Sequence, residues 1–360
     1  MNKLHDGQAF TRYSMLVLDD QGRFVRKGQG ASRTDLVVTL PELSEYFQQK
    51  VVLPPAVTDV FVWVHGWQND LVSANYDARR LFHAIETVQA ARATHYPGLR
   101  DFKPGFLAVH WPSKSPATLR GYIQMRDRAS AMTDQGYAEF FLASLLGYLD
   151  SSRGRNSVGE QGTLRSARGF AVHCVGHSFG GRFLTAAVRA AATPKSPKTL
   201  SLLREIPDTR RGLLAAGDGG DGRFAFTIDS LLVFQMAAPH KSFASQLRGL
   251  IDTAPLRGPI VLTHSKHDKA NCKWHWYAEW LESGIGCCGA TQPKEYLHAA
   301  RLHSLDQPYT SVDIPTRGIV NVDASAAYTS SSLFDVQGAH SDYWYEESIH
   351  LLLSLANATR

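Results

Sequence analysis

The chain has 360 residues, of which 44% are hydrophobic and 20% charged, and a formal net charge of +5. This composition is ordinary for a globular protein long enough to bury a sizeable core, and no dense basic stripe with interleaved aromatics indicates nucleic-acid binding. The polar stretch 1–13 and the lack of a long apolar run argue against a cleaved signal peptide and a transmembrane segment. We therefore expect a cytoplasmic protein, or one exported without a cleaved signal peptide.

The cysteines Cys174, Cys272, Cys287 and Cys288 show no disulfide framework. Cys174 lies in an apolar run, and the neighbours Cys287 and Cys288 are awkward to join to each other. We expect reduced thiols and a reducing compartment.

Residues 1–58 predict edge elements, with strands at 13–18 and 23–27 around a turn. Residues 59–64 form a continuous apolar run, which is typical of a parallel strand covered on both faces. This run ends in His65-Gly66-Trp67.

The middle of the chain alternates between strand and helix patterns. The predictions, in order, are a helix over 74–88, a strand at 105–111, an irregular polar stretch at 113–134, a helix over 137–148, a strand at 169–175 and a small-residue helix over 182–192. An insertion at 193–226 has a basic character, which suits either a solvated surface loop or a rim that attracts anionic substrates.

The last third continues the alternation. It predicts strands at 231–236, 259–263 and 318–322, a Trp-rich helix over 272–283, an irregular insertion at 284–316 and a final helix opening at 338–342. Strands that alternate with helices imply a doubly wound, mostly parallel α/β sheet with helices on both faces. No repeat or linker divides the chain, so we expect one domain over 1–360 with insertions.

The sequence Gly176-His177-Ser178-Phe179-Gly180-Gly181 joins the strand at 169–175 to the helix at 182–192. A serine in so tight a turn takes a strained backbone conformation that exposes its hydroxyl. Small residues two before and two after it let the strand and the helix approach. This pattern predicts that Ser178 is a nucleophile.

A serine nucleophile needs a base, and the base needs a carboxylate that fixes its tautomer. Catalytic groups of α/β sheets gather at the carboxyl ends of strands. Asp268 follows the strand at 259–263, and His340 follows the last strand. Asp268 has two competitors: Asp229 begins its strand, at the wrong end, and Asp323 directly follows the last strand.

Chain order and motifs resemble the α/β-hydrolase superfamily, whose triad runs nucleophile, acid, histidine. The resemblance covers the chain from about residue 59 onward and rests on VFVWVHGW, VGHSFGG, VLTHSKHD and GAHSDYW. The pattern looks closest to bacterial lipase- or esterase-like hydrolases of unassigned substrate. It implies that Ser178 is the nucleophile, His340 the general base and Asp268 its orienting acid.

An oxyanion hole requires two backbone N–H groups. Phe179 follows the nucleophile, and Trp67 belongs to a His-Gly-x segment that matches the family's form, so these two are the candidate donors. The His-Gly-Gly-Gly form of some esterases is absent. We expect His65 to brace this loop and His177 to pack beside the turn.

The Trp-rich helix predicts two faces. Trp274, Tyr277, Ala278 and Leu281 should pack on the sheet, whereas Trp276 and Trp280 point elsewhere. These two tryptophans are either buried by 284–316 or contact an acyl chain or membrane surface as substrate-binding residues.

The leading hypothesis is a serine hydrolase that cleaves a carboxylic ester. Amide, peptide or thioester hydrolysis and a non-catalytic binding protein of the same fold stay open. Dehalogenase and epoxide hydrolase chemistry is disfavoured, since relatives with those activities use an aspartate where this chain has Ser178. His264, His267 and Cys272 could be metal ligands, but no metal-type histidine pair occurs, and we expect no metal and no cofactor.

Overall fold

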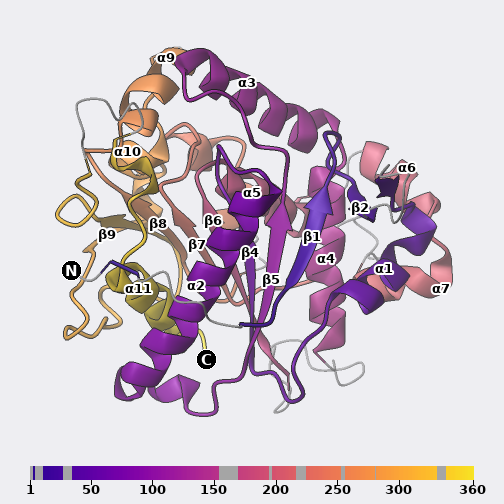
Figure 1. Cartoon of the computed structure of the whole chain (residues 1–360), viewed down its shortest axis with the longest axis horizontal. Helices are drawn as coiled ribbons and strands as arrows, with labels where there is room; N and C mark the ends of the chain where they lie inside the picture. The colour runs from indigo at the N-terminus through magenta and orange to yellow at the C-terminus, as the bar shows by residue number, and fades with distance from the viewer. Residues whose placement is uncertain are drawn as a thin grey trace.

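A ten-stranded sheet forms the centre of the protein (Figure 1). The computed structural model describes residues 3–4, 11–26, 35–153, 169–193, 197–215, 224–252, 256–279, 281–330 and 338–360. In sheet order the strands are β3 (Leu36–Val37), β2 (Phe24–Arg26), β1 (Ser14–Leu18), β5 (Pro104–His110), β4 (Asp59–Val64), β6 (Ala171–His177), β7 (Ser230–Phe234), β8 (Ile260–His264), β10 (Ile319–Asp323) and β9 (Leu297–Arg301). Only the β1–β2 and β2–β3 pairs of these described strands are antiparallel. The predicted mostly parallel α/β sheet is confirmed.

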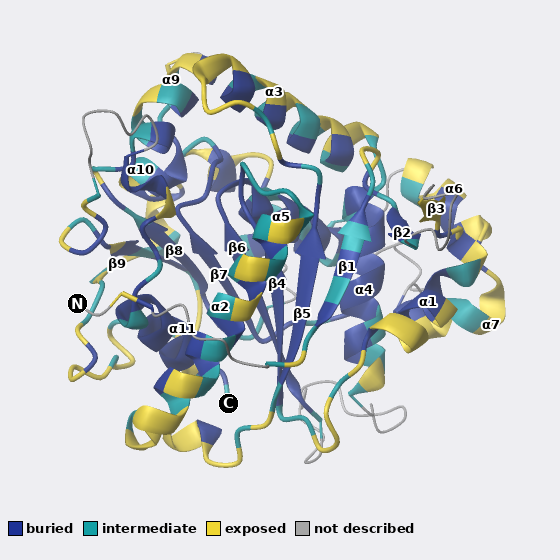
Figure 2. Ribbon diagram, in the orientation of Figure 1, coloured by how far each residue is buried: buried dark blue, intermediate teal, exposed yellow. Residues whose placement is uncertain are grey.

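Helices cover both faces of the sheet. Their bounds are α1 (Leu43–Lys50), α2 (Leu71–Ala91), α3 (Leu119–Ser130), α4 (Ala138–Ser152), α5 (Phe179–Ala192), α6 (Pro197–Arg204), α7 (Asp208–Arg211), α8 (Gly249–Asp252), α9 (His275–Ala278), α10 (Ile285–Cys288) and α11 (Glu346–Ala358). α1, α4 and α5 share one apolar cluster with the sheet, and α2 and α11 share the other. Figure 2 shows the buried strands between these layers.

Strand β4 contributes side chains to both apolar clusters. Val60, Val62 and Val64 join the cluster with α4 and α5, whereas Phe61 and Trp63 join the cluster with α2 and α11. Side chains of a strand alternate between faces, so a strand covered on both sides has to be apolar throughout. Because β4, β6, β7 and β8 run parallel, their carboxyl ends lie at one edge of the sheet.

The stretch 113–134, predicted to be irregular, contains helix α3 and a π-helical turn over Ala131–Gln135. The side chain of Thr118 caps the start of α3 by accepting from the Gly121 N–H. Tyr122, Met125 and Ala129 are buried at helical spacing. The prediction was wrong because so thin an apolar stripe is inconspicuous among charged residues.

The Trp-rich helix is shorter than predicted, with a π-helical turn over Ala270–Trp274 followed by α9. Ala278 is buried, but Tyr277 and Leu281 are 65% and 64% exposed, so the predicted packing face is wrong for both. Leu281 has φ 76°, and the helix ends before it. Helical periodicity therefore stops applying after Ala278.

The insertion at 284–316 also has more structure than predicted. It holds α10 and strand β9, which pairs in parallel with β10 at the edge of the sheet. β9 is largely exposed, so it lacks the apolar run by which the other strands are found.

The expectation of reduced thiols is wrong for two cysteines. Cys272 and Cys287 form a disulfide that joins the π-helical turn to α10, while Cys174 and Cys288 are free. Their sequence separation of 15 residues does not indicate a pairing, because only the tertiary fold places α10 against this turn. The cysteines therefore no longer support the expectation of a reducing compartment.

At the opposite edge, β1 to β3 and α1 arise from the N-terminal 58 residues. The basic insertion at 193–226 forms α6 and α7, and part of it lies outside the described residues. Within the described ranges, no helix combines the length and apolarity needed to cross a membrane.

Candidate functional site

Ser178 occupies the turn between β6 and α5 with φ 54° and ψ −123°. A non-glycine residue with positive φ is strained, and such strain persists only where the surroundings enforce it. A Cβ on Gly180 would lie 2.1 Å from the Val64 carbonyl oxygen, and one on Gly176 would lie 2.8 Å from Gly181. Strand and helix thus touch as the sequence predicts.

Ser178 and His340 are hydrogen-bonded, with 2.7 Å between Ser178 Oγ and His340 Nε2. His340 lies in the 3₁₀ turn Ala339–Ser341 before α11. Its Nδ1 lies 3.0 Å from Asp268 Oδ1 and 2.9 Å from Oδ2. The three candidate residues, far apart in sequence, form one chain of hydrogen bonds with exposures of 0–2%.

These contacts decide where the imidazole proton lies. A carboxylate can only accept, so His340 Nδ1 carries the proton and Nε2 is free to accept from the serine hydroxyl. The main chain supports this arrangement, because Ala339 N–H donates to the His267 carbonyl at 3.0 Å. The loops that carry Asp268 and His340 are therefore tied together next to the two side chains.

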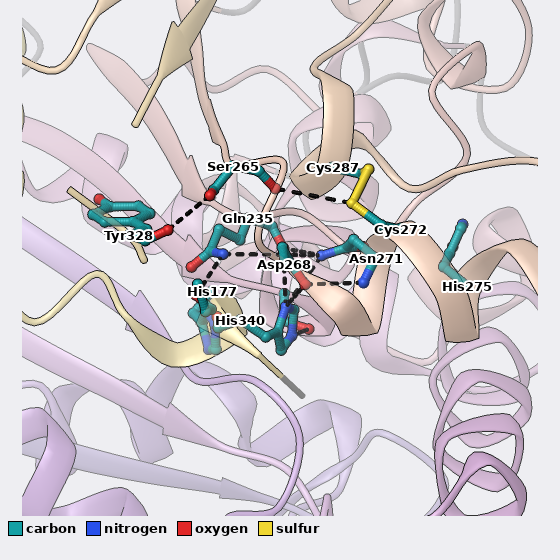
Figure 3. A network of polar contacts seen from close by, with 12 residues as sticks. His177, Gln235, Ser265, Asp268, Asn271, Cys272, His275, Cys287, Tyr328 and His340 are labelled. Carbon is teal, nitrogen blue, oxygen red and sulfur yellow. Dashed lines mark hydrogen bonds and ion pairs between the residues drawn. A yellow bond between two sulfur atoms is a disulfide. The ribbon is translucent and has the colours of Figure 1, made fainter. Parts of the chain in front are cut away.

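Asp268 accepts additional hydrogen bonds. Gln235 Nε2 donates to Oδ2 at 3.0 Å, and Asn271 Nδ2 donates to the same oxygen at 2.7 Å. The backbone N–H of Asn271 donates to Oδ1 at 2.9 Å. Figure 3 shows this group of side chains around the carboxylate.

His177, predicted to pack beside the turn, also makes a hydrogen bond. Its Nε2 donates to the His340 carbonyl at 2.8 Å. Burial, followed by the nearby His340, holds the pKa of His177 well below its usual value. His177 is therefore a neutral donor that fixes the backbone of His340.

The loop after β4 lies against the nucleophile turn. A Cβ on Gly66 would lie 3.0 Å from Ser178 Cβ. Neither the Trp67 nor the Phe179 backbone N–H donates to another described residue, whereas the next N–H, of Gln68, bonds to the Ser113 carbonyl at 3.0 Å. Both predicted donors are thus available beside Ser178.

His65 braces this loop. Its Nδ1 donates to the Gly66 carbonyl at 2.8 Å, so its Nε2 accepts from His110 Nδ1 at 2.9 Å. Burial and the adjacent His110 lower the pKa of His65 to about 3. A neutral His65 therefore orients the Gly66 peptide, and its side-chain partners among the described residues are Gly66, His110 and Trp111.

Aromatic side chains cluster on Phe179, the residue after the nucleophile. The ring centroid of Tyr122 in α3 lies 5.2 Å from that of Phe179 and 5.6 Å from that of Trp67, and the centroid of Trp274 lies 5.7 Å from that of Trp67. Ser178 itself has 0% exposure. Tyr122 also hydrogen-bonds His275 Nδ1 through its hydroxyl at 2.8 Å.

The rival acids are elsewhere. Asp323 is exposed and accepts from the Ser325 N–H at 2.9 Å. Asp229 pairs with Arg153 at 2.8 Å at the amino end of β7. Cys272, the third ligand of the conceivable metal set, is disulfide-bonded.

Of the two tryptophans predicted to bind substrate, Trp276 is half-buried and its ring centroid lies 4.9 Å from that of Tyr277. Trp280 lies outside the described residues. Their role stays a prediction, while Trp274, assigned to the sheet face, packs on Trp67 near the nucleophile.

Sequence reasoning missed Gln235, Asn271 and Tyr122. Gln235 ends an apolar strand next to the nucleophile strand, which is a signal for polar residues at the carboxyl edge. Asp268 precedes Asn271 by three residues, which is the spacing at which a side chain at the start of a helix accepts from a backbone N–H. Tyr122 had no signal because its helix was not predicted.

Comparisons with known proteins add little to what this geometry shows. No protein-family model matches the sequence, and no curated protein matches it. A crystal structure of the lin2722 gene product from Listeria innocua aligns with 12% identity over 80% of this chain and 93% of that chain, at a TM-score of 0.23. A similarity this low carries no information about function.

Proposed function

We propose that the protein is a serine hydrolase that cleaves a carboxylic ester through an acyl-enzyme. The observation that carries the proposal is the unbroken hydrogen-bond chain from Ser178 Oγ through His340 to Asp268, at 2.7 and 2.9 Å. In that chain Ser178 is the nucleophile, His340 the general base and Asp268 the group that orients the imidazole.

The reaction follows from these roles. Ser178 Oγ attacks the ester carbonyl carbon while its proton passes to His340 Nε2, and Asp268 stabilises the imidazolium. His340 then returns the proton to the alcohol as the carbon–oxygen bond to it breaks. Water, deprotonated by His340, attacks the acyl carbonyl carbon. The bond from that carbon to Ser178 Oγ then breaks, His340 returns the proton to Oγ, and the acid is released.

The Trp67 and Phe179 N–H groups are the proposed oxyanion donors, and the absence of an acceptor for either among the described residues supports this assignment. Preorganised donors of this kind stabilise charge that develops in the transition state without rearranging. His65 contributes by holding the Gly66 peptide that precedes Trp67.

The resemblance to the α/β-hydrolase superfamily, and within it to bacterial lipase- or esterase-like enzymes, supports ester cleavage before amide or thioester cleavage. The strained turn of Ser178 supports its role as nucleophile, because it is the feature expected of a nucleophile between strand and helix. The aromatic cluster of Trp67, Tyr122 and Trp274 next to this turn suits an apolar acyl group.

One observation favours a non-catalytic binding protein of the same fold, namely the complete burial of Ser178. A catalytic protein has to expose Ser178 when substrate enters. A fluorophosphonate probe distinguishes the two functions, because it modifies only a serine that is both reachable and activated.

The test combines the probe with a panel of short- and long-chain esters and matched anilides. We expect one equivalent of label on Ser178, located by peptide mass spectrometry, and faster turnover of esters than of anilides. Folded protein that neither labels nor turns over any ester would refute the proposal. Faster turnover of anilides would assign the same site to amide hydrolysis.

A further inference from the structure

Gln235 directly follows β7 and has a backbone conformation that its residue type avoids. Its φ is 47°, and its side chain is fully buried. Non-glycine residues keep such a conformation only where surrounding contacts enforce it, and they cluster at functional sites. The enforcing contact is its N–H, which donates to the Thr263 carbonyl at 3.2 Å and to Thr263 Oγ1 at 3.1 Å.

The side-chain amide of Gln235 joins two loops of the candidate site. Nε2 donates to Asp268 Oδ2 at 3.0 Å and to the Ala339 carbonyl at 2.8 Å. Both partners are pure acceptors, so the amide nitrogen has to face them and both of its hydrogens are used. One side chain therefore ties the acid to the residue that precedes His340. Figure 3 shows Gln235 next to Asp268 and His340.

The same segment also contacts the nucleophile. The Ser178 N–H donates to the carbonyl of Phe234, the residue before Gln235, at 2.9 Å. The end of β7 thus bonds to the segments that carry all three members of the hydrogen-bond chain. Among the described residues, Asn271 also contacts both Asp268 and His340, but it lies in the same loop as the acid, whereas Gln235 follows the strand paired with β6.

Asn271 extends this support. Its Nδ2 lies 2.7 Å from Asp268 Oδ2 and 3.0 Å from the Gln235 carbonyl oxygen. The Asp268 carboxylate therefore accepts from His340, Gln235 and Asn271 in a site without solvent exposure. Donors on every side leave the carboxylate one orientation, and that orientation directs the His340 ring toward Ser178.

We propose that Gln235 is a positioning residue, which aligns Asp268 and His340 with Ser178 through its two amide hydrogens. The proposal rests on the proposed function for its kinetic consequences, but its structural content does not depend on catalysis. A Gln235 that only fills space would be replaceable by any side chain of the same shape.

The test uses Gln235→Met, which keeps the length of the side chain and removes both donors. Gln246→Met is the matched control, because Gln246 is exposed and away from the site. The first readout is the downfield proton NMR resonance of His340 Nδ1–H, assigned by its loss in His340→Ala. We expect Gln235→Met to shift or broaden this resonance, since Asp268 loses its fixed orientation, and Gln246→Met to leave it in place.

The second readout is ester hydrolysis. A hydrogen bond to a charged group corresponds to roughly a 10- to 100-fold effect, so we expect kcat of Gln235→Met to fall by that factor while KM changes by less than about threefold. An unchanged His340 resonance in folded Gln235→Met overturns the proposal, whatever the kinetics. A shifted resonance in a protein whose wild type neither labels nor hydrolyses esters refutes the proposed function and supports the positioning role.

Gln235→Glu keeps the test decisive if Gln235→Met does not fold. The introduced carboxyl can donate to Asp268 only while it is protonated, and two neighbouring carboxyls hold a shared proton more tightly than one. We expect the ratio of variant to wild-type kcat to rise as pH falls. A ratio that is independent of pH would show that Gln235 does not act through its hydrogens.

Discussion

The described part of the chain holds a serine–histidine–aspartate group at each end of the same sheet. At the carboxyl end, Ser178 Oγ meets His340 Nε2 and Asp268 meets Nδ1. At the amino end, Ser230 Oγ lies 2.8 Å from His173 Nδ1, and Asp59 Oδ1 lies 3.1 Å from His173 Nε2. The two groups have similar distances and are similarly buried. The ring nitrogen that faces the serine is Nε2 in His340 and Nδ1 in His173.

The surroundings of the two groups differ. His173 and Ser230 are register partners on the adjacent strands β6 and β7, and Asp59 begins β4, so ordinary strand pairing brings them together. Asp59 is also paired with Arg360. Ser230 has an ordinary strand backbone, whereas Ser178 has φ 54°, and the backbone N–H groups of Phe179 and Trp67 have no acceptor among the described residues.

Residue types at hydrogen-bond distance therefore do not make a candidate active site by themselves. The amino-end group satisfies buried polar atoms, which would otherwise cost stability. The carboxyl-end group adds strain, free donors and loops that converge from separate strands. The following experiments test whether the two groups differ in function as these differences imply.

Replacing the two serines should give the largest contrast. Ser178→Ala should lower ester turnover by at least about 10³-fold with little change in melting temperature, because it deletes a single nucleophilic oxygen. Ser230→Ala should leave turnover within a few-fold but cost about 1–3 kcal/mol of unfolding free energy, because His173 loses a partner. Steady-state kinetics and urea unfolding of both variants measure this. Near-normal turnover of Ser178→Ala would remove the distinction.

His340→Ala should lose as much turnover as Ser178→Ala, and the double variant should lose no more, because members of a triad act as a unit. The comparison requires single-turnover kinetics of both single variants and the double variant. Additive losses would assign His340 a role outside the chain that ends in Ser178.

The two aspartates should separate activity from stability. Asp268→Asn should lower kcat by roughly 10²- to 10⁴-fold, because the amide favours the wrong imidazole tautomer. Asp59→Asn should leave Arg360 without its buried partner and cost about 3 kcal/mol of unfolding free energy. Equal effects of both substitutions on kcat would show that the amino-end group also supports catalysis. Asp323→Asn is the control for the choice of acid.

The carboxyl-end group should depend on a covalent link that the amino-end group lacks. The Cys272–Cys287 disulfide closes a loop of 15 residues next to Asn271, so Cys272→Ser with Cys287→Ser should cost about 3 kcal/mol. Turnover should fall as well, because the Cys272 N–H bonds to the Asp268 carbonyl at 2.9 Å. Urea unfolding with and without reductant checks this. Stability that is insensitive to reductant would contradict it.

Acid should destabilise the carboxyl end through its buried histidines. Burial lowers the pKa of His275 to about 3, as it does for His65. Below about pH 6.5 each of these histidines binds a proton in the unfolded chain but not in the folded protein. The free energy of unfolding therefore decreases by about 1.4 kcal/mol per histidine for each pH unit of acidification. Unfolding free energies between pH 6.5 and 4.5 measure the slope. His275→Gln should reduce this slope by the contribution of one histidine. His298→Gln, at an exposed position, is the control.

Local patterns in the sequence predicted the sheet class, most strand positions and the tight turn at Ser178. These features follow from apolar periodicity and from contacts between near neighbours, as the glycines around Ser178 show. Asp268 and His340 were predicted as well, because residues after parallel strands meet at one edge of the sheet.

Only the tertiary structure decided what surrounds that chain of residues. The Cys272–Cys287 disulfide, the contacts of Tyr122 with Phe179 and His275, and the bonds of Gln235 join segments that are distant in sequence, and no periodicity marks such contacts. The amino-end Ser230–His173–Asp59 group is equally invisible in sequence, since strand register alone aligns it. Local physics determined the elements and the turn, whereas long-range packing determined how the candidate site is held and covered.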